Sequence, residues 1–223
     1  MKSAFKNIFS GLKRPASDQE LDFHTDLQLI DKAHHRITYR GISMLKCPFD
    51  IVIYQMIISE VQPDLIIEIG TNKGGSALYL ADLLRNFGDG VVHTIDLKQE
   101  KLDPEIRSTE NIRLFEGGWQ NYSLEDCAEF DKILIIDDGS HTYEQVYQAF
   151  HKFHPVVPPG SYYIIEDGII DQLEIPKKKF NGGPLKAINE ILATNTSFKV
   201  ETKWTHFFGP NATFNTRGYL KRI

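Results

Sequence analysis

The sequence predicts an α/β fold in which a mostly parallel sheet carries helices on both faces. Short, continuous apolar runs, such as residues 65–69 and 133–137, alternate along the chain with stretches of helical periodicity. These runs lack the polar alternation of a half-exposed sheet, so we expect strands that are buried on both faces and joined by helical crossovers. The length of 223 residues is enough for one substantial core, and one domain with a short appendage is the simplest organisation.

The individual elements follow from periodicity and from proline signals. Pro48 marks a helix start, apolar residues then repeat at helical spacing from Ile51 to Val61, and Pro63 ends this helix. Apolar runs predict strands at 65–69, 91–96, 112–116, 133–137 and 162–166. Helical spacing predicts helices at 22–36, 76–86, 123–130, 143–153 and 185–194. A loop is expected over 176–184, and two late strands near 198–204 and 213–221.

The first 47 residues are expected to form a helical extension that precedes the main domain, residues 48–223. The chain opens with a basic segment that carries one apolar stripe, formed by Phe5, Ile8, Phe9 and Leu12. This segment lacks the continuous apolar region of a signal peptide. A helix that packs on its own domain or on a sister subunit is favoured over one bound at a membrane surface.

Composition excludes several classes of function. The formal net charge is −5 and the pI about 5.9, so the chain has no surplus of Lys and Arg for binding nucleic acid. No apolar run approaches the roughly 20 residues of a membrane span. The two cysteines, Cys47 and Cys127, lie far apart and suit a reducing cytosol. We therefore expect a cytoplasmic protein that acts on a small molecule.

A glycine-rich turn connects the strand at 65–69 to the next helix. Such a turn exposes backbone N–H groups to a ligand and favours a nucleotide-like cofactor. Its spacing differs from GxGxxG because Asn72 stands at the middle glycine position, and Glu68 places a carboxylate just before the turn. The negative charge of this carboxylate would repel the anionic pyrophosphate of a dinucleotide. S-adenosylmethionine has no phosphate and carries a sulfonium and an ammonium, so acidic surroundings suit it. The alternative is that the turn has a structural role only and binds no cofactor.

Asp96 strengthens this interpretation because it ends the second strand, where a carboxylate can accept hydrogen bonds from both hydroxyls of a ribose. The candidate cofactor-binding residues are Glu68, Gly70, Thr71, Gly74, Ser76, Asp96, Gly117 and Asp138. The glycine turn and Asp96 also permit an NAD-dependent oxidoreductase on a Rossmann sheet. The missing middle glycine argues against that alternative.

Carboxylates gather at the ends of two further strands. Asp137 and Asp138 end the strand at 133–137, and Glu166 and Asp167 end the strand at 162–166. The carboxyl ends of adjacent parallel strands line one cleft, and neither motif contains a lysine or arginine to neutralise the charge. Convergent carboxylates of this kind need a cation, and oxygen ligands suit Mg²⁺. We assign Asp138, Glu166 and Asp167 as metal ligands and expect Asp137 to support them.

His141 is the candidate catalytic base. It lies three residues past Asp138, where an imidazole can take a proton from a hydroxyl held on the metal. The other histidines, His34 among them, are expected to be structural. Four aromatic residues are candidates for lining a pocket for a sugar or aromatic ring, although core positions are the commoner role for such residues: Trp119, Trp204, Phe207 and Phe208.

Taken in order, the motifs resemble the cephalosporin hydroxylase-like and rhamnosyl O-methyltransferase family of class I methyltransferases. The resemblance runs from about Tyr39 to Arg222. Its motifs are Lys46-Cys-Pro48-Phe-Asp50, the glycine turn with Gly74-Gly-Ser-Ala77, Asp138-Gly-Ser-His-Thr-Tyr-Glu144, Glu166-Asp167, Gly183-Pro184, Phe214-Asn215 and Gly218-Tyr-Leu-Lys-Arg222.

The resemblance implies a Rossmann-like, seven-stranded sheet whose last strand is antiparallel, S-adenosylmethionine as methyl donor and Mg²⁺ as metal. It also implies methylation of a hydroxyl on a sugar or glycosylated natural product, with the Asp, Glu-Asp and His set binding metal and removing the proton. Multimeric assembly, often through the N-terminal helices, is usual in this family, so the resemblance also implies a homo-oligomer. A non-catalytic assembly protein that retains the fold is a further alternative. The predicted metal ligands and catalytic base are all present, which argues against a protein that has lost its catalytic activity: Asp138, His141, Glu166 and Asp167.

Overall fold

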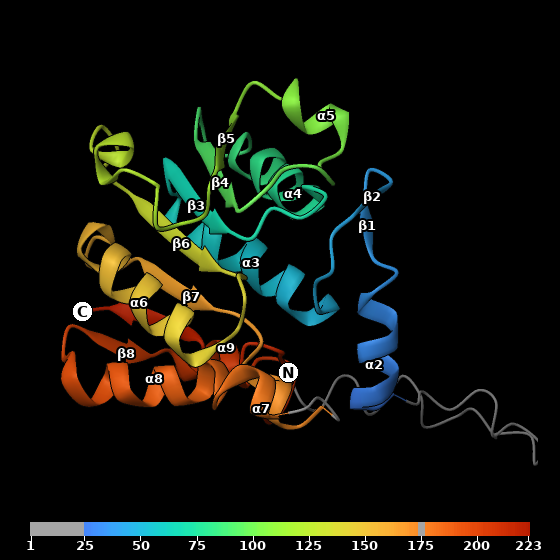
Figure 1. The fold of residues 1–223 in the computed structure, drawn as a ribbon, viewed down its shortest axis with the longest axis vertical. Coiled ribbons are helices and arrows are strands. Elements are labelled where there is room, and N and C mark those ends of the chain that lie inside the picture. Colours follow the sequence, from blue (N-terminus) through green and yellow to red (C-terminus); the bar gives the residue numbers. More distant parts are fainter. Residues whose placement is uncertain (1–24, 174–176) are drawn as a thin grey trace, which may run out of the picture.

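A mixed sheet forms the centre of the protein (Figure 1). The structure is a computed structural model and describes residues 25–173 and 177–223. The sheet has seven strands in the order β5-β4-β3-β6-β7-β9-β8. Their bounds are β3 Leu65–Ile69, β4 Val91–Asp96, β5 Ile112–Glu116, β6 Ile133–Asp137, β7 Tyr162–Ile165, β8 Phe198–Val200 and β9 Tyr219–Arg222. Only β9 runs antiparallel to its neighbours, β7 and β8, which confirms the expected sheet and its reversed last strand.

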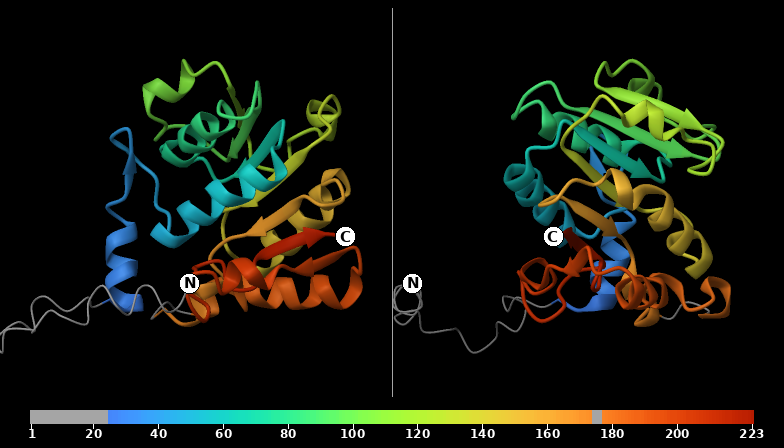
Figure 2. Two further views of the ribbon diagram at one scale, coloured as in Figure 1. Left: turned by 180° about the vertical axis from the view of Figure 1, so that it is seen from behind. Right: turned by 90° about the vertical axis from the view of Figure 1, so that its left-hand side faces the viewer.

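Helices cover both faces of this sheet (Figures 1 and 2). One face packs against α3 (Pro48–Val61) and α4 (Gly75–Leu84), the other against α6 (Tyr143–Phe153) and α8 (Gly183–Thr194). Side chains along a strand alternate between the two faces of a sheet. In β3, Ile66 accordingly packs against the first helix layer, and Leu65 and Ile67 pack against the second. The central strands β3 and β6 are therefore buried on both sides, which is the continuous apolar pattern seen in the sequence, whereas the edge strand β5 exposes Arg113 and Glu116.

Local signals explain where the main helices begin and end. Pro48 occupies the first turn of α3, and Gln62 ends the helix in the left-handed conformation, with φ 47°, directly before Pro63. Pro184 opens α8 in the same way. The strands β3, β4, β5 and β6 and the helices α3 and α6 have the bounds that the sequence predicts.

Residues before α3 pack on the sheet domain. Helix α2 (Leu27–His34) begins at Asp26, whose side chain accepts a hydrogen bond from the backbone N–H of Leu29 at 2.8 Å. A two-stranded hairpin follows, formed by β1 (Thr38–Tyr39) and β2 (Ile42–Ser43). The hairpin lies so close to α4 that a Cβ on Gly75 would stand 2.4 Å from the carbonyl oxygen of Ser43. The apolar stripe at residues 5–12 lies outside the described residues, and the domain boundary at residue 47 stays a prediction.

The remaining elements are short and connect the main ones. They are α5 (Pro104–Arg107), α7 (Lys177–Phe180), α9 (Thr202–Thr205) and the 3-10 turns η2 (Leu124–Cys127), η3 (His154–Val156) and η4 (Gly168–Asp171). Within the ranges that the structure covers, the longest apolar helices fall short of what a membrane crossing requires.

Four predicted elements differ in kind from the structure. The loop expected over 176–184 instead includes α7 and, from Gly183, the start of α8. The helix expected at 123–130 is only the 3-10 turn η2, and the strand expected near 198–204 ends at Val200 and gives way to α9. The strand expected from residue 213 begins only at Tyr219. The physical reason is tertiary: the backbone N–H of Phe214 donates to the buried carboxylate of Asp50 at 3.0 Å, so this stretch does not join a strand ladder.

Candidate active site

A cavity of about 450 Å³ lies at the carboxyl edge of the sheet. Its walls come from the loops that follow β3, β4, β5 and β6, from Asp167 after β7, and from the segment before α3. This volume is in the range of small-molecule sites. Of the residues predicted to bind a cofactor, metal or proton, those on its wall are Gly70, Thr71, Ser76, Asp96, Asp138, His141 and Asp167.

The turn after β3 is tightly packed against the loop after β6. Gly70 has φ +104°, and a Cβ there would stand 2.2 Å from the carbonyl oxygen of Asp138. The backbone N–H of Asp138 donates in turn to the carbonyl of Ile69 at 2.9 Å. Only glycine fits position 70, so the glycine loop and the start of the acidic motif are held at a fixed separation.

Glu68 lies beneath the glycine loop and not on the cavity wall. It is fully buried, and it accepts hydrogen bonds from the hydroxyls of Ser76 and Thr94, the latter at 2.6 Å. Burial raises the pKa of this carboxyl. The expected cofactor residues Gly74 and Gly117 also lie outside the lining, because Gly74 packs on the side chain of Ile106 and Gly117 turns toward its own loop. Glu68 thus joins β3, α4 and β4 below the site.

Asp96 lies on the wall and also organises the glycine loop. Its Oδ2 accepts from the backbone N–H groups of Thr71 and Asn72 at 3.1 and 2.9 Å, and its Oδ1 accepts from that of Leu97 at 2.7 Å. These three contacts fix the carboxylate at the rim of the cavity. A carboxylate held in this way is rigid, which suits the expected role of binding two hydroxyls.

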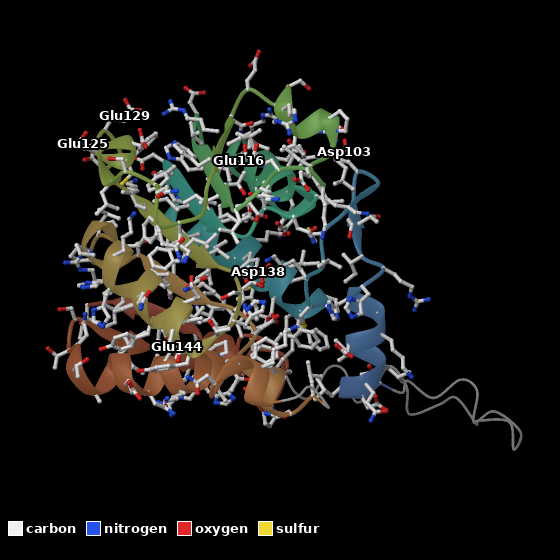
Figure 3. All side chains as sticks on the ribbon, in the orientation of Figure 1. Asp103, Glu116, Glu125, Glu129, Asp138 and Glu144 are labelled. Atoms are coloured by element: carbon white, nitrogen blue, oxygen red, sulfur yellow. The ribbon has the colours of Figure 1, made fainter. Side chains whose placement is uncertain are left out.

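Asp138, His141 and Asp167 form a compact group on the cavity wall. One ligand atom from each lies within 4.8 Å of the others. The Nε2 atom of His141 is 3.6 Å from Asp138 Oδ1 and 3.3 Å from Asp167 Oδ2. Figure 3 shows Asp138 near the middle of the molecule, beside the end of β6. The two carboxylates supply the oxygen donors that a hard divalent cation such as Mg²⁺ prefers, and the imidazole of His141 lies beside them.

Two residues of this group have a costly backbone conformation. His141 has φ 56° and Asp167 has φ 57°, the left-handed region that L-residues other than glycine rarely adopt. Each such residue costs on the order of 1 kcal/mol and persists only where surrounding contacts hold it. The conformation aims both side chains at Asp138.

Lys46 opens one of the family motifs, but sequence reasoning assigned it no role in the site. Its ammonium donates to Asp138 Oδ2 and to Glu166 Oε1, both at 2.5 Å, and its side chain is 2% exposed. Neither acidic motif contains a basic residue, but Lys46 reaches the cluster from another segment, so the inference that all these carboxylates lack a cationic partner in the protein is wrong. Burial opposes the charge, but the two carboxylates raise the pKa of Lys46 above its ordinary value, so the ammonium stays charged. Because Lys46 stands 92 residues before Asp138, local spacing does not reveal the contact.

Glu166 consequently has a different setting from the other two predicted metal ligands. It is buried, lies outside the cavity lining, and is bound through Oε1 to Lys46. Asp138 belongs to both halves of the cluster, since its Oδ2 contacts Lys46 while its Oδ1 faces His141. The structure thus divides the predicted cluster into a part that faces the cavity and a part that faces an internal lysine.

Asp137 is buried at the end of β6, and its expected role of supporting the metal ligands stays a prediction. Its carboxylate accepts from the backbone N–H of Gly139 and from the hydroxyl of Tyr163, each at 3.4 Å. Burial raises the pKa of Asp137 to about 7. The side chain lies outside the cavity lining.

Several cavity residues follow from no motif. His34, which we expected to be structural, lines the cavity from α2. Trp119 lines it as well, and its indole N–H donates to Gln145 at 3.2 Å. Trp204 is instead a core residue that donates to the hydroxyl of Tyr162 at 3.2 Å. The other two aromatic candidates are exposed on the surface: Phe207 and Phe208.

Sequence comparison identifies relatives over most of the chain. Residues 31–223 match the family model described as rhamnosyl O-methyltransferase/CmcI. The rhamnosyl O-methyltransferase of Mycobacterium tuberculosis is 32% identical over 160 residues, which cover 69% of this chain and 65% of that protein. The match thus spans slightly less than two thirds of that relative. The enzyme of the same name from Mycobacterium leprae is 29% identical over 157 residues, 68% of each chain.

Solved structures share the fold. A structure of CmcI with Mg and SAM has a TM-score of 0.64 at 23% identity, covering 95% of this chain and 88% of that one. The O-methyltransferase TomG from Streptomyces achromogenes, in complex with SAM, has a TM-score of 0.51 at 17% identity, with 92% of each chain covered. At these identities the likeness concerns the architecture of the sheet and its helices.

Proposed function

Because the chain belongs to the rhamnosyl O-methyltransferase/CmcI family, we propose that it is an S-adenosylmethionine-dependent and Mg²⁺-dependent O-methyltransferase. The acceptor is a hydroxyl of a small molecule, namely a sugar or a glycosylated natural product. The observation that carries the proposal is the shared cavity: the glycine loop and Asp96 line it together with Asp138, His141 and Asp167. A methyl donor and an acceptor hydroxyl would meet there.

The cofactor half of the site consists of the loop from Gly70 to Asn72 and the carboxylate of Asp96. Asp96 would accept hydrogen bonds from the ribose hydroxyls while it holds the loop through Thr71 and Asn72. Glu68 acts from below, because its contacts to Ser76 and Thr94 keep the loop in place. Trp119 offers an aromatic wall on the same cavity.

The metal half of the site consists of Asp138, Asp167 and Glu166. The first two fit a cation directly, since their oxygens converge on the cavity with His141. Lys46 contacts one oxygen each of Asp138 and Glu166, and each carboxylate has a second oxygen to offer. The ammonium also cancels one of the three negative charges, which leaves a net charge that one divalent ion balances.

When bound, the metal ion would act as a Lewis acid that lowers the pKa of the acceptor hydroxyl, and the sulfonium of S-adenosylmethionine would supply the methyl group. The protein contributes alignment and proton transfer. His141 accepts the proton at Nε2, the atom that faces Asp138 and Asp167. The two carboxylates stabilise the imidazolium that results. The new C–O bond replaces the C–S bond, and the products are a methyl ether and S-adenosylhomocysteine.

Asp138→Ala tests this function. Labelled methyl transfer to a panel of sugars and glycosides should require a divalent ion in the wild type and should be lost in Asp138→Ala, whereas the exposed control Asp89→Ala should retain it. Calorimetry should show binding of S-adenosylhomocysteine. Unchanged turnover in excess EDTA would refute the metal requirement, and tight binding of NADH in place of S-adenosylhomocysteine would indicate an oxidoreductase.

We also propose that the protein is a cytoplasmic homo-oligomer. The buried thiols of Cys47 and Cys127, which form no disulfide in the structure, support a reducing compartment. Light scattering of the full chain tests the oligomeric state, and a monomer at all concentrations would contradict it.

A further inference from the structure

A buried polar network lies behind the acidic cluster. We define the Asn215 network as five side chains that are each at most 2% exposed and lie outside the cavity lining: Asp50, Tyr54, Thr213, Asn215 and Tyr219. Asp50 and Tyr54 come from successive turns of α3, and the other three come from the last segment of the chain. The mechanism uses none of them. Burying polar groups is costly unless they are hydrogen-bonded, so the partners of each group show what the network holds in place.

Asp50 anchors the last segment to α3. Its carboxylate accepts hydrogen bonds from the hydroxyls of Thr213 and Tyr219, the latter at 2.9 Å, and from the backbone N–H of Phe214 at 3.0 Å. The Thr213 hydroxyl oxygen then accepts from the backbone N–H of Asn215 at 2.9 Å. These contacts fix the position of Asn215.

The side chain of Asn215 connects this anchor to the acidic cluster. Its Nδ2 donates to the hydroxyl of Tyr54 at 2.8 Å, which orients the amide. Its Oδ1 accepts from the backbone N–H of Asp167 at 3.3 Å. Asp167 is the residue with φ 57° whose carboxylate faces His141. The amide therefore contacts the backbone at the point where that backbone takes its unusual conformation.

The surrounding backbone leaves little room for adjustment. A Cβ on Gly168 would stand 2.4 Å from the carbonyl oxygen of Thr216, and one on Gly218 would stand 1.9 Å from that of Ile165. The backbone N–H of Ile169 also donates to the carbonyl of Phe214 at 2.9 Å. The last segment thus packs directly on both sides of Asp167, so its position and that of Asp167 are coupled.

We propose that Asn215 is a positioning residue for the metal site: its amide holds the backbone of Asp167 in the left-handed conformation that aims this carboxylate at Asp138 and His141. The inference rests on the proposed function, because it concerns the metal affinity of the same cluster. The direction of a side chain follows from its backbone, so loss of the amide contact lets the Asp167 carboxylate turn away. Outer contacts of this kind typically change metal affinity by about 10–100-fold.

Calorimetric titration of the full chain with Mn²⁺, free of other ligands, tests this role. We expect Asn215→Ala to bind Mn²⁺ about 10–100-fold more weakly than the wild type. Asn111→Ala is the matched control, because the Asn111 amide donates to the backbone carbonyls of Ala81 and Gly90, away from the cavity. Its Mn²⁺ affinity should stay within about twofold of the wild type. Binding of S-adenosylhomocysteine should be unchanged in both, which a general loss of folding would not allow.

Tyr54→Phe is the second variant, since it keeps the ring in the core and removes the hydroxyl that accepts from Asn215. Because that hydroxyl also lies beside Glu166, the result is interpreted together with that of Asn215→Ala. Tyr54→Phe should weaken Mn²⁺ binding in the same direction. Equal Mn²⁺ affinity of Asn215→Ala, Tyr54→Phe and the wild type would overturn the positioning role and leave the proposed function standing. A wild type that binds S-adenosylhomocysteine but not Mn²⁺ would overturn the metal site and this inference together.

Discussion

Replacement of Lys46 by methionine is the sharpest test of how the acidic cluster is built. Methionine keeps the length and shape of the lysine stem but removes the ammonium. That ammonium is 2.5 Å from both Asp138 Oδ2 and Glu166 Oε1, and the lysine side chain is 2% exposed. The variant therefore leaves two carboxylates close together without their shared cation.

The expected cost is large because the partners stay buried. Removing one member of a buried ion pair typically destabilises a protein by about 3–5 kcal/mol. In a chain of 223 residues each kcal/mol lowers Tm by about 2–4 °C. We therefore expect Lys46→Met to lower Tm by roughly 6–20 °C in EDTA. Added Mg²⁺ should recover more stability in the variant than in the wild type, because it replaces the missing positive charge.

Lys203→Met is the matched control for a lysine in an ion pair. Its ammonium is 2.6 Å from Glu60 Oε2, but the side chain is 47% exposed. Exposed pairs are worth about 0–1 kcal/mol, so this variant should unfold close to the wild type. Urea unfolding in EDTA measures both variants. A Lys46→Met protein within about 1 kcal/mol of the wild type would refute the reasoning that Lys46 holds the cluster together.

Three further predictions concern the glycine loop, a buried histidine and Asp96. Gly70→Ala should destabilise the protein by about 2–4 kcal/mol, because its Cβ would stand 2.2 Å from the Asp138 carbonyl oxygen; normal unfolding in urea would contradict this. Burial lowers the pKa of His93 from 6.5 to about 4. The folded state therefore disfavours its protonation, so the wild type should lose up to about 3 kcal/mol as pH falls from 6.5 to 4. His93→Asn should reduce that loss in urea titrations at several pH values; an unchanged pH dependence would exclude His93. Asp96→Ala should weaken binding of S-adenosylhomocysteine about tenfold or more in calorimetry, since it removes the acceptor and frees the N–H groups of the loop, and equal affinity would argue against this role.

Local pattern was enough to place the main elements of the sheet. Strands β3, β4, β5 and β6 and helices α3 and α6 have their predicted bounds, because each is defined by an apolar run or a helical period and by a nearby proline, glycine or cap. The same logic failed where a tertiary contact decides the conformation. The sequence from residue 213 resembles a strand, but the backbone N–H of Phe214 donates to the Asp50 carboxylate instead of to a neighbouring strand. The strand therefore begins only at Tyr219.

The candidate site divides in the same way. The sequence by itself determined that Asp138, His141 and Asp167 come together, because residues after adjacent parallel strands meet at one edge of a sheet. It also determined that Gly70 makes the tight turn beside them.

Only the tertiary structure decided how the charges of the cluster are balanced and held. Lys46 reaches Asp138 across 92 residues and Glu166 across 120, and Asn215 reaches Asp167 across 48. It also decided that Glu68 lies below the cofactor loop and that His34 lines the cavity. No period or local spacing encodes such pairings, because they depend on which helix faces and loop ends pack together once the sheet has formed.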